Sequence, residues 1–199
     1  MNKYHKIPLI AGLLYLLSLI ISVTFSWLSG DHLFDLGISF SAYVGLHRWT
    51  SVMYFVFVAV ITISMTVYIS NNKIPFVKKI IDYIIITGIF GTAFFPFNIF
   101  SDHPTAITVD IHNYFGIGLM LATTVSFIFS FISSKIRKHK ISAMTSFAFA
   151  SVFSTLYFLG IPMLFGTFFI WENIFIVLLF IELYMEQYEK PKELTNDKI

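Results

Sequence analysis

The chain has 199 residues and a formal net charge of +2, yet only 12% of its residues are charged and 57% are hydrophobic. Its mean hydropathy is +0.80. Soluble domains carry about 25% charged residues, so this composition excludes an ordinary soluble domain and favours an integral membrane protein. The absence of cysteine excludes disulfides, thiolate metal sites and cysteine nucleophiles.

Six apolar runs follow one another along the chain, at about residues 8–29, 48–70, 80–99, 111–133, 142–163 and 166–187. About 20 helical residues span the roughly 30 Å hydrocarbon core of a bilayer, and each run has about this length. The first run is longer than the apolar region of a signal peptide, so we interpret it as a retained helix. The pattern predicts an all-α polytopic membrane bundle of six transmembrane helices. It forms one integral membrane domain over residues 1–199, with a cytoplasmic tail at 188–199.

Basic residues mark one side of this predicted bundle. Twelve of the thirteen lysines and arginines fall there: Lys3, Lys6, Lys73, Lys78, Lys79, Lys135, Arg137, Lys138, Lys140, Lys190, Lys192 and Lys198. Only Arg48 falls on the other side. Because cytoplasmic loops are enriched in basic residues, the N- and C-termini are both predicted to be cytoplasmic. The abundance of Phe, Ile, Lys and Asn is typical of AT-rich bacterial genomes. We therefore expect a bacterial plasma membrane protein, with membrane lipids as partners and no nucleic acid.

Two runs carry small residues on one helical face: Gly88, Gly91 and Thr92 in the third run, and Ala148, Ser151, Ser154 and Thr155 in the fifth. Small side chains let helices approach closely in lipid, so we interpret both faces as contacts between helices. Pro96 removes one backbone hydrogen bond and predicts a kink or an end of the third helix. The carbonyl of Thr92 then needs another partner, which Asn98 or a neighbouring helix can supply.

The side opposite the basic loops gathers the residues of a candidate outer polar site: His47, Arg48, Asn98, Asp102, His103, Asp110, His112, Asn113 and Glu172. Glu172 lies about five residues inside the sixth predicted helix, roughly 7–8 Å along its axis. A lone carboxylate at the centre of a membrane helix costs about 2.5–3.5 kcal/mol, and less nearer the interface. Arg48 is the only outer cation besides histidine, so it is the first candidate to pair with Glu172.

Three of these residues also allow a metal-dependent interpretation. His47, His112 and Glu172 come from three predicted helices at similar depth, and imidazole with carboxylate suits zinc. Asp102 or Asp110 would then serve as the general base of an intramembrane hydrolase. The chain contains no HExxH motif and no other histidine spacing typical of a metal site. Zinc is therefore the alternative to a site without a cofactor.

A structural interpretation accounts for part of the same polarity. Asp110 stands at the predicted start of the fourth helix, where aspartate is a favoured N-cap. Asp102 and His103 precede a proline and are typical of a turn. On this interpretation His112 and Asn113 lie in the first helical turn, where their side chains can reach water.

Toward the basic side, three acidic residues have ordinary explanations. Asp82 follows Lys78 by four residues, a spacing at which oppositely charged side chains pair on a helix. Glu186 precedes Lys190 by the same spacing, so we expect a second pair there. The side chain of Glu182 is expected to reach the inner interface.

Short motifs give the chain a resemblance to one family. They are Asp35-Leu36-Gly37 before the second helix, Phe95-Pro96 at the end of the third and His112-Asn113 at the start of the fourth. On these motifs the chain resembles the six-helix bacterial membrane proteins of domain-of-unknown-function family 998, similar in layout to the DRAM- and Frag-like group, over roughly residues 8–187. The resemblance implies a six-helix membrane fold and carries no catalytic residues with it. The chain is less similar to the alkaline-ceramidase and adiponectin-receptor-like hydrolases, because it lacks their seventh helix and their paired His-xxx-His.

Three classes of function fit these observations. The first, which we favour, is a non-enzymatic accessory, sensor or immunity-type membrane protein whose outer polar site binds a membrane-protein partner or a lipid headgroup. The second is the metal-dependent hydrolase with zinc. The third is a small transporter, which the lack of charge in the middle of the helices disfavours.

Overall fold

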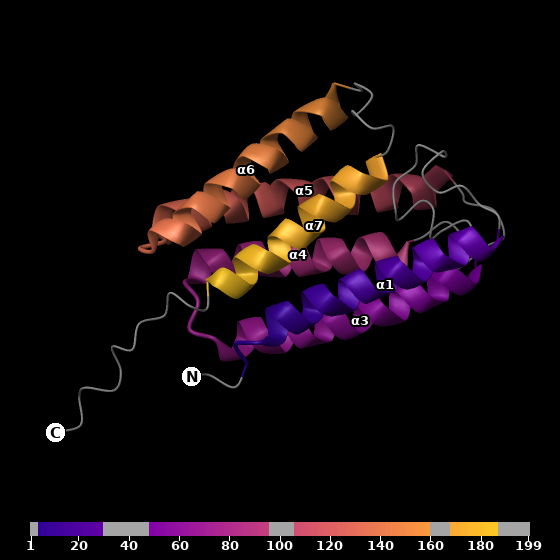
Figure 1. Ribbon diagram of the computed structural model, residues 1–199, viewed down its shortest axis with the longest axis horizontal. Coiled ribbons are helices and arrows are strands. Elements are labelled where there is room, and N and C mark those ends of the chain that lie inside the picture. The colour runs from indigo at the N-terminus through magenta and orange to yellow at the C-terminus, as the bar shows by residue number, and fades with distance from the viewer. Residues whose placement is uncertain (1–3, 30–47, 96–105, 160–167, 187–199) are drawn as a thin grey trace.

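The computed structural model describes residues 4–29, 48–95, 106–159 and 168–186, with side chains at all of these except 26, 48, 106–109 and 168–169. Six α-helices make up almost all of the described chain: α1 (Ile7–Ser29), α3 (Arg48–Asn71), α4 (Phe76–Phe94), α5 (Ala106–Ser133), α6 (Arg137–Phe158) and α7 (Phe168–Met185). No β-strand occurs in these described ranges. The prediction of an all-α fold is confirmed (Figure 1).

Four stretches of the described helices are long and apolar enough to cross a membrane: Ile7–Ser29, Trp49–Asn71, Asp110–Ser133 and Arg137–Phe158. The other two helices are shorter and carry internal charges. α4 has 19 residues with Lys78, Lys79 and Asp82 in its first half. α7 has 18 residues and contains Glu172 and Glu182. The sequence predicted six membrane spans. Among the described residues there are six helices, and four of them are long and apolar enough to cross a membrane.

Large apolar side chains remain exposed on the outside of the bundle. On α1, 57% of the surface of Leu13 is exposed, and on α3 the value for Ile63 is 65%. Monomeric soluble proteins rarely expose continuous apolar surface, whereas lipid tails are as apolar as these side chains. This exterior is therefore typical of a protein surrounded by a bilayer.

The helices run lengthwise through the molecule (Figure 1), and their contacts form a closed ring. Each one packs against its neighbours in the chain, and α1 also packs against α7 to close the ring. The starts of α1, α4 and α6 lie together at one end, which we call the basic end because it holds Lys6, Lys73, Lys78, Lys79, Lys135, Arg137, Lys138 and Lys140. The opposite end, where α3 begins at Arg48, we call the cavity end.

α4 and α5 approach each other closely at two glycines of α4. A Cβ atom on Gly88 would lie 2.8 Å from Cβ and 3.1 Å from Cα of Leu119, and one on Gly91 would lie 2.2 Å from Cγ of Phe115. Carbon atoms without a bond between them prefer separations of about 3.5–4.0 Å, so neither position has room for a side chain. Thr92 is buried on the same face. The interpretation of Gly88, Gly91 and Thr92 as a packing face is confirmed.

The small residues of α6 pack differently from the prediction. Ala143, Ser146 and Ala150 are buried, whereas Ala148 and Thr155 are exposed. The prediction was therefore wrong for Ala148 and Thr155, while Ser151 and Ser154 are partly buried. Small residues occur on several sides of this helix, and only its contacts with α5 and α7 decide which of them turn inward.

Three helices begin earlier than hydropathy predicts, α4 and α6 among them. α4 begins at Phe76 and α6 at Arg137, because charged residues at the ends of the apolar runs continue the helical backbone. α4 ends at Phe94, followed by Phe95 with a φ of −103° and a ψ of 45°. A residue before proline is disfavoured in the helical region, so the predicted helix end at Pro96 is confirmed.

The start of α5 corrects the interpretation of Asp110. The helix begins at Ala106, about one turn before the predicted start, because no glycine or proline interrupts the stretch that precedes Asp110. Asp110 is thus an exposed residue inside the helix and not its N-cap. His112 and Asn113 correspondingly lie in the second helical turn, not in the first.

Candidate functional site

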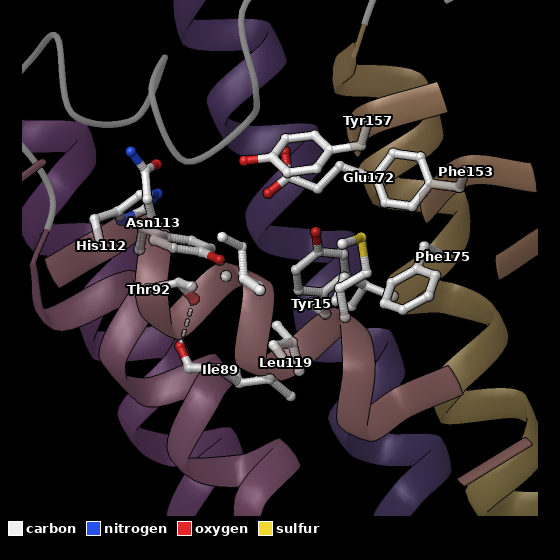
Figure 2. Close-up of a pocket in the computed structure, with 15 residues that line it drawn as sticks. Tyr15, Ile89, Thr92, His112, Asn113, Leu119, Phe153, Tyr157, Glu172 and Phe175 are labelled. Atoms are coloured by element: carbon white, nitrogen blue, oxygen red, sulfur yellow. Dashed lines mark hydrogen bonds between the residues drawn. The ribbon is translucent and has the colours of Figure 1, made fainter. Parts of the chain in front are cut away.

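A cavity of about 320 Å³ lies inside the ring at the cavity end, and every one of the six helices contributes to its wall (Figure 2). Its polar rim contains His112 and Asn113 from α5 on one side, and Tyr157 from α6 with Glu172 from α7 on the other. Deeper in, the wall is aromatic and aliphatic. The cavity therefore combines hydrogen-bonding groups at one level with apolar surface at the next.

The apolar interior of the cavity comes from helices that are far apart in the sequence. Phe153 on α6 and Phe175 on α7 lie with their ring centroids 5.6 Å apart. Ile89 from α4 and Met120 from α5 contribute aliphatic surface. Apolar side chains that face an internal space gain contacts when an apolar group fills it, which favours a ligand with a hydrocarbon part.

His112 is held against the end of α4, and only 7% of its surface is exposed. The backbone carbonyls of Thr92 and Phe95 lie beside its imidazole. Position 96 is proline and has no N–H, so the carbonyl of Thr92 lacks the donor that a helix supplies four residues later. His112 on the neighbouring helix stands beside that carbonyl, where the sequence analysis expected a partner.

Two tyrosines form the polar part of the cavity interior. The hydroxyl of Tyr15 donates to Oδ1 of Asn173 at 2.7 Å, which ties α1 to α7. Tyr15 and Tyr54 are 2% and 5% exposed, and both hydroxyls lie within electrostatic range of Glu172. A buried tyrosine hydroxyl needs a polar partner, and Asn173 provides it for Tyr15.

Replacing Tyr15 by phenylalanine is expected to lower the free energy of unfolding by about 1 kcal/mol, because the ring stays while the bond to Asn173 is lost. Unfolding by SDS in mixed micelles measures the change. The control is Tyr83→Phe, which removes an exposed contact of 3.0 Å with Ser70 and should change stability by less than about 0.5 kcal/mol. Equal losses in the two variants would contradict a special role for the buried bond.

The structure describes the side chains of four residues from the candidate outer polar site. His112, Asn113 and Glu172 line the same cavity, although they come from two helices. Asp110 is exposed and is not part of the cavity wall. The other members lie outside the described side chains: His47, Arg48, Asn98, Asp102 and His103. The pairing of Glu172 with Arg48 therefore stays a prediction.

Metal binding was the alternative interpretation of this site. Within the described part of the chain, no three His, Asp or Glu side chains come close enough together to hold a metal ion. The predicted zinc set of His47, His112 and Glu172 includes one residue outside that part. Zinc and the hydrolase activity that depends on it remain predictions from the sequence.

Sequence reasoning missed the aromatic half of the cavity. Tyr15 and Tyr54 offered a usable signal, since a tyrosine inside an apolar run must find a partner for its hydroxyl. Phe153 and Phe175 offered none. The chain contains 24 phenylalanines, and nothing in their spacing distinguishes the two that face the cavity.

A second group of buried polar side chains lies near the basic end, between α6 and α7. Glu182 is 1% exposed and accepts hydrogen bonds from Ser142 at 2.6 Å and from Ser146 at 3.2 Å. Its Oε2 atom lies 3.0 Å from Nε2 of His139, which is itself 2% exposed. The expectation that Glu182 reaches the interface was wrong, because three polar groups on α6 hold its side chain inside the bundle.

A neighbouring ion cluster joins α4, α5 and the end of α7. Lys78 pairs with Asp82 on the same helix, which confirms the predicted pair. The ammonium of Lys78 also lies 3.2 Å from Oε1 of Glu186, and Ser130 donates to that oxygen at 2.6 Å. Lys190, the predicted partner of Glu186, lies outside the described residues.

Comparisons of the chain with protein-family profiles, curated proteins and solved structures gave no match. The resemblance to family 998 therefore stays a prediction from short motifs. Any function has to be argued from the cavity and the side chains around it.

Proposed function

We propose that the chain is a six-span bacterial plasma membrane protein with both termini in the cytoplasm, and that its cavity binds a membrane lipid by the headgroup. On this proposal the protein belongs to the non-enzymatic accessory, sensor or immunity class, and α4 and α7 cross the membrane with the four more apolar helices. The observation that carries the proposal is the cavity at the end of the ring, with a polar rim above an interior that is mainly aromatic and aliphatic.

The distribution of charge supports this orientation. The basic residues of the described chain gather at the basic end, and only Arg48 stands at the other. Cytoplasmic membrane surfaces are anionic and attract basic residues near the ends of membrane helices. With the basic end inside, the cavity lies in the outer half of the membrane.

The size and polarity of the cavity favour an amphipathic ligand. Its volume of about 320 Å³ falls at the lower end of ligand pockets, which range over about 300–1,000 Å³. A lipid headgroup with the first carbons of its chains suits that space. The imidazole of His112, the amide of Asn113 and the carboxylate of Glu172 offer both donors and acceptors to such a headgroup.

Filling the cavity with a side chain tests the proposal. Gly116 lines the cavity, and a Cβ built on it meets only Cγ2 of Thr92, at 3.9 Å. Gly116→Leu is therefore expected to fold and to occupy the space of the ligand. Native mass spectrometry of purified protein mixed with phosphatidylethanolamine or phosphatidylglycerol should detect at least about tenfold less retained lipid in this variant.

Gly118→Leu is the matched control, because Gly118 lies two residues further along α5, outside this cavity, with no atom within 4 Å of a Cβ at its position. The same glycine-to-leucine change is made in both variants, so their helix propensities change alike. The control should retain as much lipid as the unmodified protein. Equal retention by the two variants would place any bound lipid elsewhere and refute lipid binding in the cavity.

A further inference from the structure

The carboxylate of Asp82 makes only half of the contacts that an ionised carboxylate needs. The residue is 2% exposed, and its Oδ1 atom accepts a hydrogen bond from the ammonium of Lys78. Its Oδ2 atom is also buried, and no hydrogen-bond partner for it occurs among the described residues. An ionised carboxylate accepts at both oxygens, and a buried acceptor without a partner is unfavourable, most of all when it is charged.

The charges around Asp82 do not balance. Lys78 is shared between Asp82 and Glu186, so two carboxylates meet one ammonium. α3 and α5 carry no charged side chain in their halves near the basic end. From α7 comes Glu182, whose carboxylate is bound by polar groups of α6, among them His139. A buried site with one surplus carboxylate takes up a positive charge, because an unpaired charge at low dielectric is costly.

The packing of α4 against α5 brings a second partnerless polar atom to this place. The helices are antiparallel, with Gly88 against Leu119 near their middle and Ser130 at the same Glu186 oxygen as Lys78 near the basic end. Moving along α4 toward its start therefore corresponds to moving along α5 toward its end.

This register sets Ser126 of α5 opposite Asp82 of α4. Ser126 is 1% exposed, and its hydroxyl likewise has no hydrogen-bond partner among the residues that the structure describes. A hydroxyl oxygen can accept a hydrogen bond from a protonated carboxyl group. Ser126 on the facing helix is therefore a candidate acceptor for a proton carried by Oδ2 of Asp82.

We propose that Asp82 is a buried proton-binding site. In the folded protein, Oδ2 of Asp82 binds one proton that comes from the solvent at the basic end. The resulting O–H group points toward Ser126. Lys78 and Glu186 then remain as a balanced ion pair, and no other bond changes. The ligand is a proton and not a metal cation, because the ammonium of Lys78 already stands beside the same carboxylate. The site is independent of the lipid cavity at the other end of the ring.

The dependence of thermal stability on pH tests this proposal. Unfolding exposes Asp82 to water, where an aspartic acid releases its proton above about pH 4. Stability should therefore fall as the pH rises, with the melting temperature of the unmodified protein in detergent dropping by about 3 °C or more between about pH 5 and about pH 8. Asp82→Asn keeps a neutral polar group of the same shape. Its melting temperature should drop by less than half as much, and at the higher pH it should equal or exceed that of the unmodified protein.

Asp110→Asn is the matched control, since it makes the same change at an exposed residue and should follow the unmodified protein at every pH. Parallel pH profiles for the unmodified protein and Asp82→Asn would overturn the proposal. A second result would also overturn the proposal. If sodium chloride but not potassium chloride stabilised the unmodified protein, and Asp82→Asn abolished this effect, the site would bind sodium.

Infrared spectroscopy gives a reading that does not depend on the stability of the variant. A protonated carboxyl group has a C=O stretch that an ionised carboxylate lacks. The unmodified protein at about pH 5 should show this band, and it should shift when Ser126 is replaced by alanine. Absence of the band in folded, unmodified protein would overturn the proposal.

Discussion

Replacing Glu182 by leucine is expected to lower the free energy of unfolding by about 3 kcal/mol. Ser142, Ser146 and His139 would all lose the carboxylate that they meet inside the bundle. Single hydrogen bonds between membrane helices average about 0.6 kcal/mol, so three of them account for about 2 kcal/mol. The rest comes from His139, which stays buried opposite an apolar side chain.

Glu182→Gln separates the charge of the carboxylate from its role as an acceptor. The amide oxygen can still accept from Ser142 and Ser146, so this variant should lose only about 1 kcal/mol. SDS-driven unfolding in mixed micelles compares the two variants directly. If leucine proves no more harmful than glutamine, the hydrogen bonds to α6 do not stabilise the bundle.

Replacing Gly88 by alanine is expected to lower the free energy of unfolding by about 2 kcal/mol, although alanine is the better helix former. The new Cβ would lie 2.8 Å from Cβ of Leu119 and 3.1 Å from its Cα atom, so relief requires the backbones to separate. Overpacking of this kind costs about 1–3 kcal/mol. Separation of α4 from α5 also weakens the contact between His112 and the end of α4.

The same substitution at Gly118 should have the opposite sign. No atom lies within 4 Å of a Cβ at that position, so alanine adds helix propensity without a clash and stabilises by up to about 1 kcal/mol. One unfolding assay measures both variants, and the change in the free energy of unfolding should be negative for Gly88→Ala and positive for Gly118→Ala. A gain at both positions would mean that α4 and α5 are packed less tightly than these distances indicate.

The helical fold could be predicted from the sequence, because apolar runs of about 20 residues permit few structures other than membrane helices. The ends of the helices were harder to predict from the sequence, since hydropathy reports lipid exposure and not backbone conformation. Arg137 and Lys140 are helical although they precede the predicted apolar run at 142–163. Asp110 shows the same difficulty in reverse, because a favoured capping residue occurs one turn inside its helix.

The candidate site could be predicted from the sequence only in part. Polarity at the ends of apolar runs singled out His112, Asn113 and Glu172, which the structure brings to one cavity wall. The role of Glu182 was missed, because its partners lie on α6 and about 40 residues away. Contacts of this kind depend on how each helix is rotated, and periodicity within one helix carries no information about its neighbour.

Closure of the ring by its first and last helices constrains how the chain is made. Tyr15 and Asn173 are separated by 158 residues, and Gly12 packs against Phe180. Ribosomes add about 5–20 residues per second, so α1 waits many seconds in the membrane before α7 exists. During that interval its inward face must be shielded by lipid or by an insertion factor. A chain that stops short of α7 cannot complete the cavity, which makes full-length synthesis a precondition of its formation.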